Sequence, residues 1–411
     1  MAPIMKIKLM RQIDYWLGIP LCLLLTIINY ILRPFVFKRR REMIPKKILF
    51  IKLSEMGSII LAYPLLSKIQ KVYPETKIFF LTFEKNRPLF QILNIVSSNN
   101  VLTIRENSIQ SLILDTLRVI SRLRKEGIDI AFDLEFFSRF TAILTYLSGA
   151  DKRVGFYPYS MEGLYRGKLL THKTQYNPLI HISKSYLSLL QGVKKRTKST
   201  PELEEKIEDR EIVLPRFILS EEEKKKVWAK LKKFGIDEGS RLFLINSDEG
   251  NLPLREWPIE NFIDLSELIL ENNNDNFIII VGTQNSLTKG EVICNTLNSK
   301  RCLNLVDKTT LRELLTLFSL SEALIVNDCG LAHLASLTPI RKFILFGPEN
   351  PQVYSPIGSN SWMIFSGLPC SPCLSAFNHR NSACKDNRCL KMIKPQEVYN
   401  LIVTHLKERI L

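Results

Sequence analysis

The stretch ILFIKLSEMGSIILAYPLLSKIQKV, residues 48–72, joins a short apolar run to an amphipathic segment. Residues 48–53 are almost entirely apolar, which is typical of a parallel strand buried on both faces. From residue 59 to residue 72 the apolar side chains recur at helical spacing, and a Tyr-Pro pair then ends the helix. Residues 77–81 (KIFFL) form the next strand. The sequence therefore predicts a βαβ unit, and its first turn lies at the carboxyl end of a strand, where doubly wound sheets bind ligands.

Further apolar runs extend this pattern into two series. They are IDIAFDL (128–134) with a helix at 140–148 in the first series, and LFLI (242–245), FIIIV (277–281), ALIV (323–326) and KFILF (342–346) in the second. Between them, residues 194–240 are rich in Lys and Glu, which indicates a linker and a solvated helix. We therefore expect an α/β protein of two Rossmann-like doubly wound domains, residues 46–215 and 216–411, facing a cleft.

Composition limits the classes of partner. The 411 residues are 45% hydrophobic, so the chain can bury large cores. Its 57 Lys and Arg outnumber its 41 Asp and Glu, and a net charge of +16 favours anionic partners such as acidic lipids or phosphorylated small molecules. Binding to nucleic acid is not expected, because no basic and aromatic recognition motif occurs. Eight cysteines are too few for a secreted disulfide scaffold.

Residues 1–45 form a membrane-associated segment in this interpretation. No charged side chain occurs from Tyr15 to Leu32, about 18 residues, which is near the shortest length that crosses a bilayer core. Aromatic residues lie near both ends, and Lys38-Arg-Arg-Arg41 follows, which places the main body in the cytoplasm by the positive-inside rule. We expect an anchor at about residues 13–37. The sequence leaves two geometries open, a helix that spans the membrane and a helix that lies in its interface.

The second series contains a candidate anion site. The strand ALIV runs into NDCGLAH, residues 327–333, and a helix follows. A glycine in the first helical turn lets a ligand approach the backbone, and the exposed N–H groups with the helix dipole bind anions. The same strand-turn-helix pattern is common in α/β proteins without such a site. The Gly-rich fingerprints of dehydrogenases and P-loop enzymes are absent, which disfavours both classes.

The order of several motifs points to a family. Along the chain these are KLSEMGS (52–58), REWP (255–258), TTLREL (309–314), NDCGLAH (327–333), FGP (346–348) and PCSPC (369–373). This succession resembles glycosyltransferase family 9, the heptosyltransferases that extend the inner core of bacterial lipopolysaccharide. The resemblance covers roughly residues 46–400. It implies a GT-B fold, a nucleotide-diphospho-sugar donor, a lipid-linked or lipopolysaccharide-type acceptor, and inverting transfer without a metal cofactor at the cytoplasmic face of the inner membrane.

The resemblance also implies a donor site in the C-terminal domain. Ser247 matches a hydroxyl that contacts phosphate, and Arg255 matches a basic residue that faces the diphosphate. Cys329 stands where the family has a Ser or Thr hydroxyl. The full set of expected donor-binding residues is Ser247, Arg255, Thr309, Asp328, Cys329, Gly330 and His333.

The loop after the first strand departs from the family pattern. This loop holds Lys52, Gly57 and Ser58, and the family has an Asp base where Ser58 stands. A serine hydroxyl is too weakly basic for this role, and inverting transfer needs a carboxylate or His to take the acceptor proton. A second function therefore stays open, a catalytically degenerate relative that binds a sugar nucleotide without transferring the sugar.

Three carboxylates are candidate bases. Glu55 lies in the same loop, and Glu135 lies at the carboxyl end of the 128–134 strand, with Asp133 as its weaker companion. Because side chains alternate along a strand, residues 133 and 135 share one face. The residues alone do not separate Glu55 from Glu135.

Residues 158–183 form a polar and aromatic segment that we interpret as a loop. Long loops at a cleft commonly carry binding function, so we expect acceptor contacts from Arg166 and His172. An ordinary surface loop is the alternative.

Four cysteines gather late in the chain, namely Cys370, Cys373, Cys384 and Cys389. Thiols at this density suit a structural zinc site, and unliganded or redox-paired thiols are the alternative. Neither reading requires a metal in catalysis.

Overall fold

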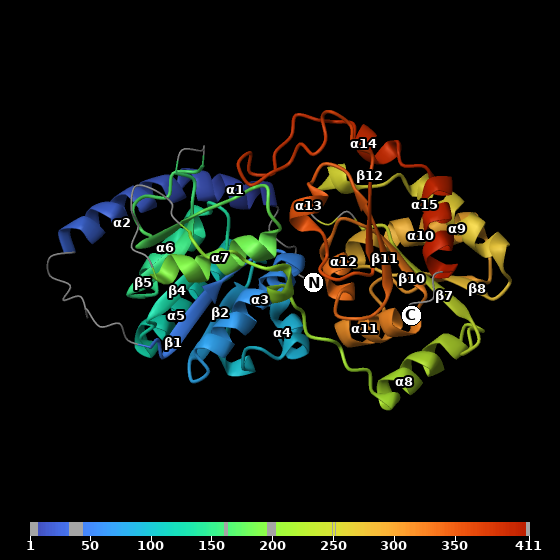
Figure 1. Ribbon diagram of the computed structural model, residues 1–411, viewed down its shortest axis with the longest axis horizontal. Helices are drawn as coiled ribbons and strands as arrows, with labels where there is room; N and C mark the ends of the chain where they lie inside the picture. The colour runs from blue at the N-terminus through green and yellow to red at the C-terminus, as the bar shows by residue number, and fades with distance from the viewer. Residues whose placement is uncertain are drawn as a thin grey trace. The chain divides into compact units, whose positions relative to one another are not determined.

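The computed structural model describes residues 7–32, 44–159, 163–194, 203–248, 250 and 252–407. The basic run at residues 38–41 lies outside this part of the chain. The chain divides into two compact units, Met1–Val213 and Leu214–Leu411, each built on a six-stranded sheet (Figure 1).

The first sheet is entirely parallel and has the order β3-β2-β1-β4-β5-β6. Its strands are β1 (Lys47–Ile51), β2 (Lys77–Phe83), β3 (Val101–Ile104), β4 (Ile130–Asp133), β5 (Lys152–Tyr157) and β6 (His172–Gln175). The predicted strands at 48–53, 77–81 and 128–134 are confirmed as β1, β2 and β4. Ile51 lies beside Asp133 in the register, so the carboxyl ends of β1 and β4 are neighbours.

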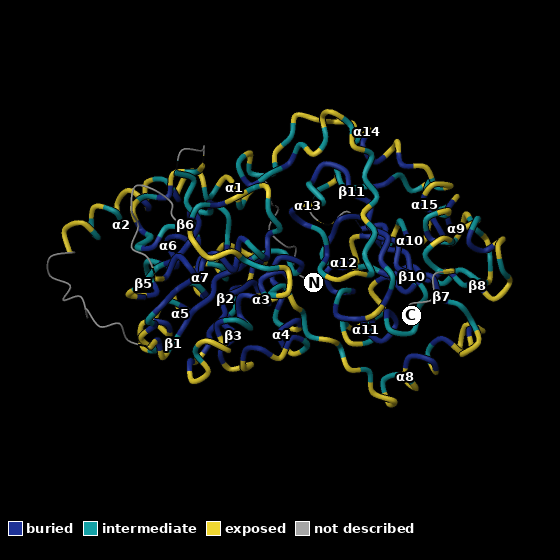
Figure 2. Tube along the Cα trace, viewed as in Figure 1, coloured by how far each residue is buried: buried dark blue, intermediate teal, exposed yellow. Residues whose placement is uncertain are grey.

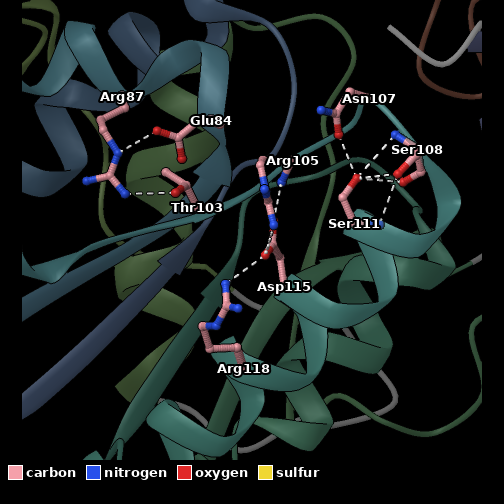
Figure 3. Close-up of polar contacts among 9 residues, drawn as sticks. All are labelled: Glu84, Arg87, Thr103, Arg105, Asn107, Ser108, Ser111, Asp115 and Arg118. Atoms are coloured by element: carbon pink, nitrogen blue, oxygen red, sulfur yellow. Dashed lines mark hydrogen bonds and ion pairs between the residues drawn. The ribbon is translucent and has the colours of Figure 1, made fainter. Parts of the chain in front are cut away.

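Helices cover both faces of this sheet. They are α3 (Met56–Val72), α4 (Arg87–Leu93), α5 (Ile109–Glu126), α6 (Arg139–Leu147) and α7 (Ile182–Lys194). Right-handed crossovers put α3 and α4 on one face and α5 and α6 on the other. α7 packs against α3 and so covers the first of these faces. The start of α5 is fixed by a reciprocal capping box between Ser108 and Ser111 (Figure 3).

The N-terminal segment packs against the first unit. Its helices α1 (Ile7–Trp16) and α2 (Gly18–Leu32) lie against α6. Asp14 accepts the backbone N–H of Phe140 at 2.9 Å and pairs with Arg139 at 3.3 Å, while Met10 packs against the core beneath α5 and α6. The apolar stretch Leu9–Leu32 is long enough to cross a membrane, and only 11% of its apolar window is buried, which is weak evidence for a membrane segment.

The segment at residues 158–183 is more ordered than the sequence suggested. It contains β6 and the first two residues of α7, and His172 lies in the strand. The prediction of a loop over this whole range is wrong there. HKTQ has no apolar run, and its place as an edge strand comes from its pairing with β5.

The second sheet is also parallel, with the order β12-β11-β10-β7-β8-β9. Its strands are β7 (Arg241–Asn246), β8 (Asn276–Ile280), β9 (Cys302–Asn304), β10 (Ala323–Asn327), β11 (Arg341–Phe346) and β12 (Ser361–Phe365). Its helices are α8 (Glu221–Lys232), α9 (Ile259–Asn272), α10 (Leu287–Leu297), α11 (Leu311–Leu320), α12 (Gly330–Ala335), α13 (Pro351–Tyr354), α14 (Arg388–Lys391) and α15 (Pro395–Lys407). The four predicted strands of the second series are confirmed as β7, β8, β10 and β11.

The helix expected to be solvated, α8, is amphipathic. Val227, Trp228 and Leu231 are buried, and the helix packs against α11 of the second unit. The charged residues at 221–226 precede them and are exposed or half-buried, which explains why the sequence indicated a solvated helix. Figure 2 shows how the buried residues concentrate along the strands of each unit.

Candidate functional site

Glu135 holds the loop that follows β1. Its Oε2 accepts Lys52 Nζ at 2.6 Å, and its Oε1 accepts the backbone N–H groups of Leu53 at 3.0 Å and Ser54 at 3.2 Å. Lys52 is itself buried, so the pair is shielded from solvent. Both oxygens of this carboxylate are therefore engaged in holding the loop. The geometry gives Glu135 a structural role.

Glu55 lies at the tip of the same loop and faces Ser58. Its backbone has a φ of 67°, a strained value for a residue other than glycine, and it is the residue before α3. Ser58 Oγ donates to Glu55 Oε2 at 3.0 Å, and the Glu55 side chain is half-buried. Gly57 and Ser58 are buried in the first turn of α3. A carboxylate of Glu55 therefore lies within hydrogen-bond distance of the side chain at position 58.

Asp133 is fully buried at the end of β4. Its Oδ2 lies 3.5 Å from Arg166 Nη1, and its Oδ1 accepts the backbone N–H of Glu135 at 3.1 Å. Burial raises the pKa of Asp133 to about 7, against the opposing charge of Arg166. Although Asp133 and Glu135 are two residues apart, Asp133 faces the interior and contacts Arg166, whereas Glu135 faces the loop.

Arg166 and His172, the expected acceptor-binding residues, are also buried. Arg166 donates to the carbonyl oxygen of Phe156 and lies over the ring of Phe137, 5.3 Å from its centroid. His172 Nδ1 lies 2.9 Å from Thr171 Oγ1 within the edge strand. Both side chains contact the interior of their own unit, and their role in acceptor binding stays a prediction.

In the second unit, Arg255 is held between two carboxylates at the carboxyl edge of the sheet. Its Nε lies 3.4 Å from Asp328 Oδ2, and its Nη2 donates to Glu349 Oε1 at 2.6 Å. Arg255 Nη1 also donates to the backbone oxygen of Asp328 at 3.3 Å. Asp328 follows β10 and Glu349 follows β11, so neighbouring strand ends fix the guanidinium.

The REWP motif explains how Arg255 reaches this edge. The buried Trp257 donates its backbone N–H to Asn327 Oδ1 at 3.2 Å and its ring N–H to the oxygen of Ile393 at 3.0 Å. Pro258 then precedes α9 as its N-cap residue. These hydrogen bonds hold the loop between β7 and α9 against the end of β10, and Arg255 lies two residues before Trp257.

Cys329 replaces a hydroxyl in the family motif, and its thiol faces the interior. Its Sγ lies 3.4 Å from Asn246 Oδ1 at the end of β7. Burial raises the pKa of Cys329 to about 12, so the thiol is neutral at physiological pH. Gly330 starts α12, and His333 lies one turn further on with 6% of its surface exposed.

The remaining donor-binding candidates lie at other strand ends of the same unit. Ser247 follows β7 and is buried, and its Oγ has no hydrogen-bond partner among the residues that the structure describes. Thr309 is half-buried and precedes the capping box formed by Thr310 and Glu313 at the start of α11. Ser247 thus keeps an unused hydroxyl at this edge.

Two residues of this cluster were not predicted. Glu349 has no exposed surface, and its Oε1 also lies 3.2 Å from Arg380 Nε. The strand-end rule could have found Glu349, since it follows β11 by three residues. Arg380 comes from the irregular segment that contains the cysteines, and no local signal relates it to Arg255.

The four cysteines of that segment differ in exposure. Cys370 and Cys384 are exposed, Cys373 is half-buried and Cys389 is buried. Cys384 Sγ donates to the oxygen of Asp386 at 2.9 Å, and Cys373 Sγ lies 3.5 Å from Ser382 Oγ. Within the described ranges, no three His, Cys, Asp or Glu side chains form a group that could hold a metal ion. Zinc at these cysteines stays a prediction.

The sequence of this chain is similar to that of known proteins with an assigned family. A family model for glycosyltransferase family 9 (heptosyltransferase) matches residues 116–383. The chain is 23% identical to lipopolysaccharide heptosyltransferase 2 of Salmonella typhimurium over 323 residues, which are 77% of this chain and 87% of that protein.

Two solved structures share the fold. The E. coli ADP-heptose lps heptosyltransferase II has a TM-score of 0.66 and 20% identity, covering 88% of this chain and 98% of that one. A family 9 glycosyl transferase from Veillonella parvula DSM 2008 has a TM-score of 0.68 and 18% identity, covering 89% and 98%.

Two parallel doubly wound sheets in this order, together with these neighbours, define a GT-B glycosyltransferase fold. The family model covers more than half of the chain, and the chain belongs to glycosyltransferase family 9, the heptosyltransferase family.

Proposed function

We propose that this glycosyltransferase moves a heptose from ADP-heptose to a lipopolysaccharide-type, lipid-linked acceptor at the cytoplasmic face of the inner membrane. The donor follows from the E. coli relative, which is named as an ADP-heptose enzyme, and the acceptor from the Salmonella relative, which is named as a lipopolysaccharide enzyme. The observation that carries the proposal is Arg255, a guanidinium fixed by Asp328 and Glu349 at the ligand-binding edge of the second sheet.

In the mechanism that we propose for this transfer, Glu55 takes the proton of the acceptor hydroxyl. The acceptor oxygen forms a bond to the anomeric carbon, the bond from that carbon to the diphosphate oxygen breaks, and ADP leaves with the negative charge. Arg255 stabilises the departing diphosphate through charge-assisted hydrogen bonds. Ser247 contributes its unused hydroxyl to a phosphate oxygen. We expect this chemistry to need no divalent cation.

Nucleotide release separates transfer from binding alone. The protein is incubated with a panel of nucleotide sugars, with and without a lipid-linked saccharide acceptor, and free nucleotide is measured. Release of ADP from ADP-heptose only when the acceptor is present supports the proposal. Release from a different nucleotide sugar would replace the proposed donor.

Ser58 and the buried thiol of Cys329 favour a second candidate function, a catalytically degenerate relative that only binds. Both residues replace groups with chemical roles in the family motif. Donor binding by calorimetry with no transfer to any lipid-linked saccharide would make this candidate the better account.

A further inference from the structure

Exposed apolar side chains concentrate on one face of the first unit. Helices α3, α4 and α7 cover one face of its sheet and expose a single large apolar residue, Val72, in the part of the chain described. The opposite face carries α5 and α6, and α1 and α2 pack over it. The exposed large apolar residues there are Leu9, Tyr15, Trp16, Leu17, Leu21, Leu23, Leu24, Ile27, Tyr30, Ile31, Leu32, Ile109, Ile113, Leu114 and Leu117. Exposed apolar residues in this number on one side of a domain indicate an interaction surface.

One side of α2 is attached to the domain along its length. Gly18, Cys22, Thr26 and Asn29 recur at helical spacing and face α6 and the segment near Lys168. Lys168 donates its backbone N–H to Thr26 Oγ1 at 3.0 Å and accepts Asn29 Nδ2 at 3.5 Å. Figure 1 shows α1 and α2 extending along the first unit beside α6.

This attachment favours one of the two geometries that the sequence left open. The middle of a spanning helix lies in the hydrocarbon core. A soluble domain cannot pack against it there, because the loops of that domain would lose the water that hydrogen-bonds their backbone. The middle of α2 instead contacts Ala142, Ile143 and Leu169, and Cys22 has no exposed surface. The helix therefore lies flat on the domain, and its other side exposes apolar residues such as Leu24 and Ile27.

α5 presents a second apolar strip from the same face. Its Asp115 points inward and accepts Arg105 Nε at 2.8 Å and Arg118 Nη1 at 2.9 Å (Figure 3). These contacts fix the rotation of the helix about its axis. Leu114 and Leu117 consequently lie outward, with exposed fractions of 59% and 60%.

The charge of this face suits an anionic surface. Among the described side chains, the helices α1, α2, α5 and α6 expose five basic residues, Arg11, Arg118, Arg122, Arg124 and Lys125, whereas their three acidic residues, Asp14, Asp115 and Glu126, are half-buried or buried. Each of the three acidic residues already pairs with a cation of the protein. Apolar helices flanked by Lys and Arg bind the interface of anionic membranes.

We propose that this face, the outer sides of α1, α2 and α5, is a monotopic membrane-binding surface that seats the first unit on an anionic bilayer, with α2 in the plane of the interface. This inference rests on the proposed membrane association and is independent of the sugar transferred. The occupant is the bilayer surface, and α5 acts as a second contact beside the N-terminal helix.

Depth measurement tests the orientation of α2 in the full-length protein. Trp16 is the only tryptophan of the first unit, so Trp16→Phe with Leu24→Trp places a new probe on the outer side of α2. The protein is bound to phosphatidylcholine and phosphatidylglycerol vesicles that carry bromine at shallow or deep acyl positions. We expect shallow bromine to quench the probe more strongly. Stronger quenching by deep bromine would show a spanning helix and overturn the in-plane geometry while leaving membrane association intact.

Replacing exposed leucines of α5 by glutamate tests whether this helix contacts the membrane. Leu114→Glu with Leu117→Glu should lower the partition coefficient to anionic vesicles at least about tenfold, because two apolar side chains leave the interface. Val72→Glu, at the one exposed apolar position on α3, is the matched control and should bind normally. Circular dichroism and transfer to a detergent-solubilised acceptor should be unchanged in both variants. Unchanged vesicle binding of the α5 variant would contradict the membrane-binding surface. Dimerisation through this face, detected by light scattering, would also contradict it. Loss of transfer with intact vesicle binding would count only against the proposed function.

Discussion

Ser58 Oγ donates a hydrogen bond to Glu55 Oε2 at 3.0 Å, from the first turn of α3 to the residue before it. The family resemblance implies an aspartate where Ser58 stands, so this chain has a carboxylate beside that position instead of at it. Glu55 reaches it through a backbone with a φ of 67°. Strained backbone of this kind persists only where the surroundings hold it, and it often occurs at functional sites.

Glu55→Gln should lower turnover at least about a hundredfold, because a general base typically contributes about 10²–10⁴-fold. Affinity for ADP should be unchanged by calorimetry, since the donor contacts belong to the other unit. Adding Ser58→Asp to the Glu55→Gln variant should restore part of the turnover, because the carboxylate then occupies the family position. Full activity of the Glu55→Gln variant would remove Glu55 from the mechanism.

Glu135→Gln should act on stability more than on chemistry. It leaves the buried Lys52 ammonium without its carboxylate, and breaking a buried ion pair in this way costs about 3–5 kcal/mol. Urea denaturation measures the loss. Lys52→Met combined with Glu135→Gln should recover part of it, and a large loss of turnover in a Glu135→Gln protein of normal stability would show that Glu135 is the base after all.

Arg255→Ala should weaken binding of ADP by about 1.5–3 kcal/mol, the usual contribution of a hydrogen bond to a charged group. Arg241→Ala is the matched control, because Arg241 pairs with Glu322 at the opposite end of β7. Calorimetry of both variants provides the comparison. Equal affinities would show that the guanidinium only bridges Asp328 and Glu349.

Asp133 should make the first unit less stable as the pH rises. Its pKa of about 7 in the folded protein exceeds the value of about 3.9 in an unfolded chain, so the folded state holds a proton that the unfolded state releases between these values. The free energy of unfolding should fall across this window by up to about 1.4 kcal/mol per pH unit. Asp133→Asn should remove the slope in urea denaturation across a pH series, whereas Asp151→Asn, which changes an exposed carboxylate, should keep it.

Transfer should continue in EDTA, because Arg255 supplies the positive charge that a divalent cation provides in other transferases. Activity that is lost in EDTA and restored by magnesium or manganese would contradict this. Restoration by zinc alone, together with one bound zinc by elemental analysis, would instead assign the metal to the cysteine segment and to folding. Cys373→Ser and Cys389→Ser should then lower the zinc content.

The strands were predictable where burial on both faces gives a continuous apolar run, as in ILFIKL and FIIIV. HKTQ was not predictable, because an edge strand with polar residues takes its structure from the neighbour it pairs with. The same limit applies to the N-terminal helices. Their hydropathy indicates lipid, and nothing in it shows that Asp14 caps α6.

The sequence predicted that the site residues lie at strand ends, but it did not predict the role of each residue. Asp328 and Glu135 follow strand ends, as the sequence indicated, and the folded chain brings them beside Arg255 and Lys52. Whether a polar residue serves a ligand or the interior depends on its tertiary partner, and Arg166 has Asp133. Glu349 and Arg380 are separated from Arg255 by about a hundred residues, and only the folded chain brings them together.

The cap that Asp14 places on α6 links the N-terminal helix to the loop of Glu55. α6 begins four residues after Glu135, and Glu135 holds the backbone of Leu53 and Ser54. A domain seated on the bilayer through α1 and α2 would thus hold the loop that contains Glu55 at a constant height above the lipid headgroups. Its encounters with a lipid-linked acceptor would then occur by lateral diffusion in two dimensions, so its rate would depend on the surface density of the acceptor and not on its bulk concentration.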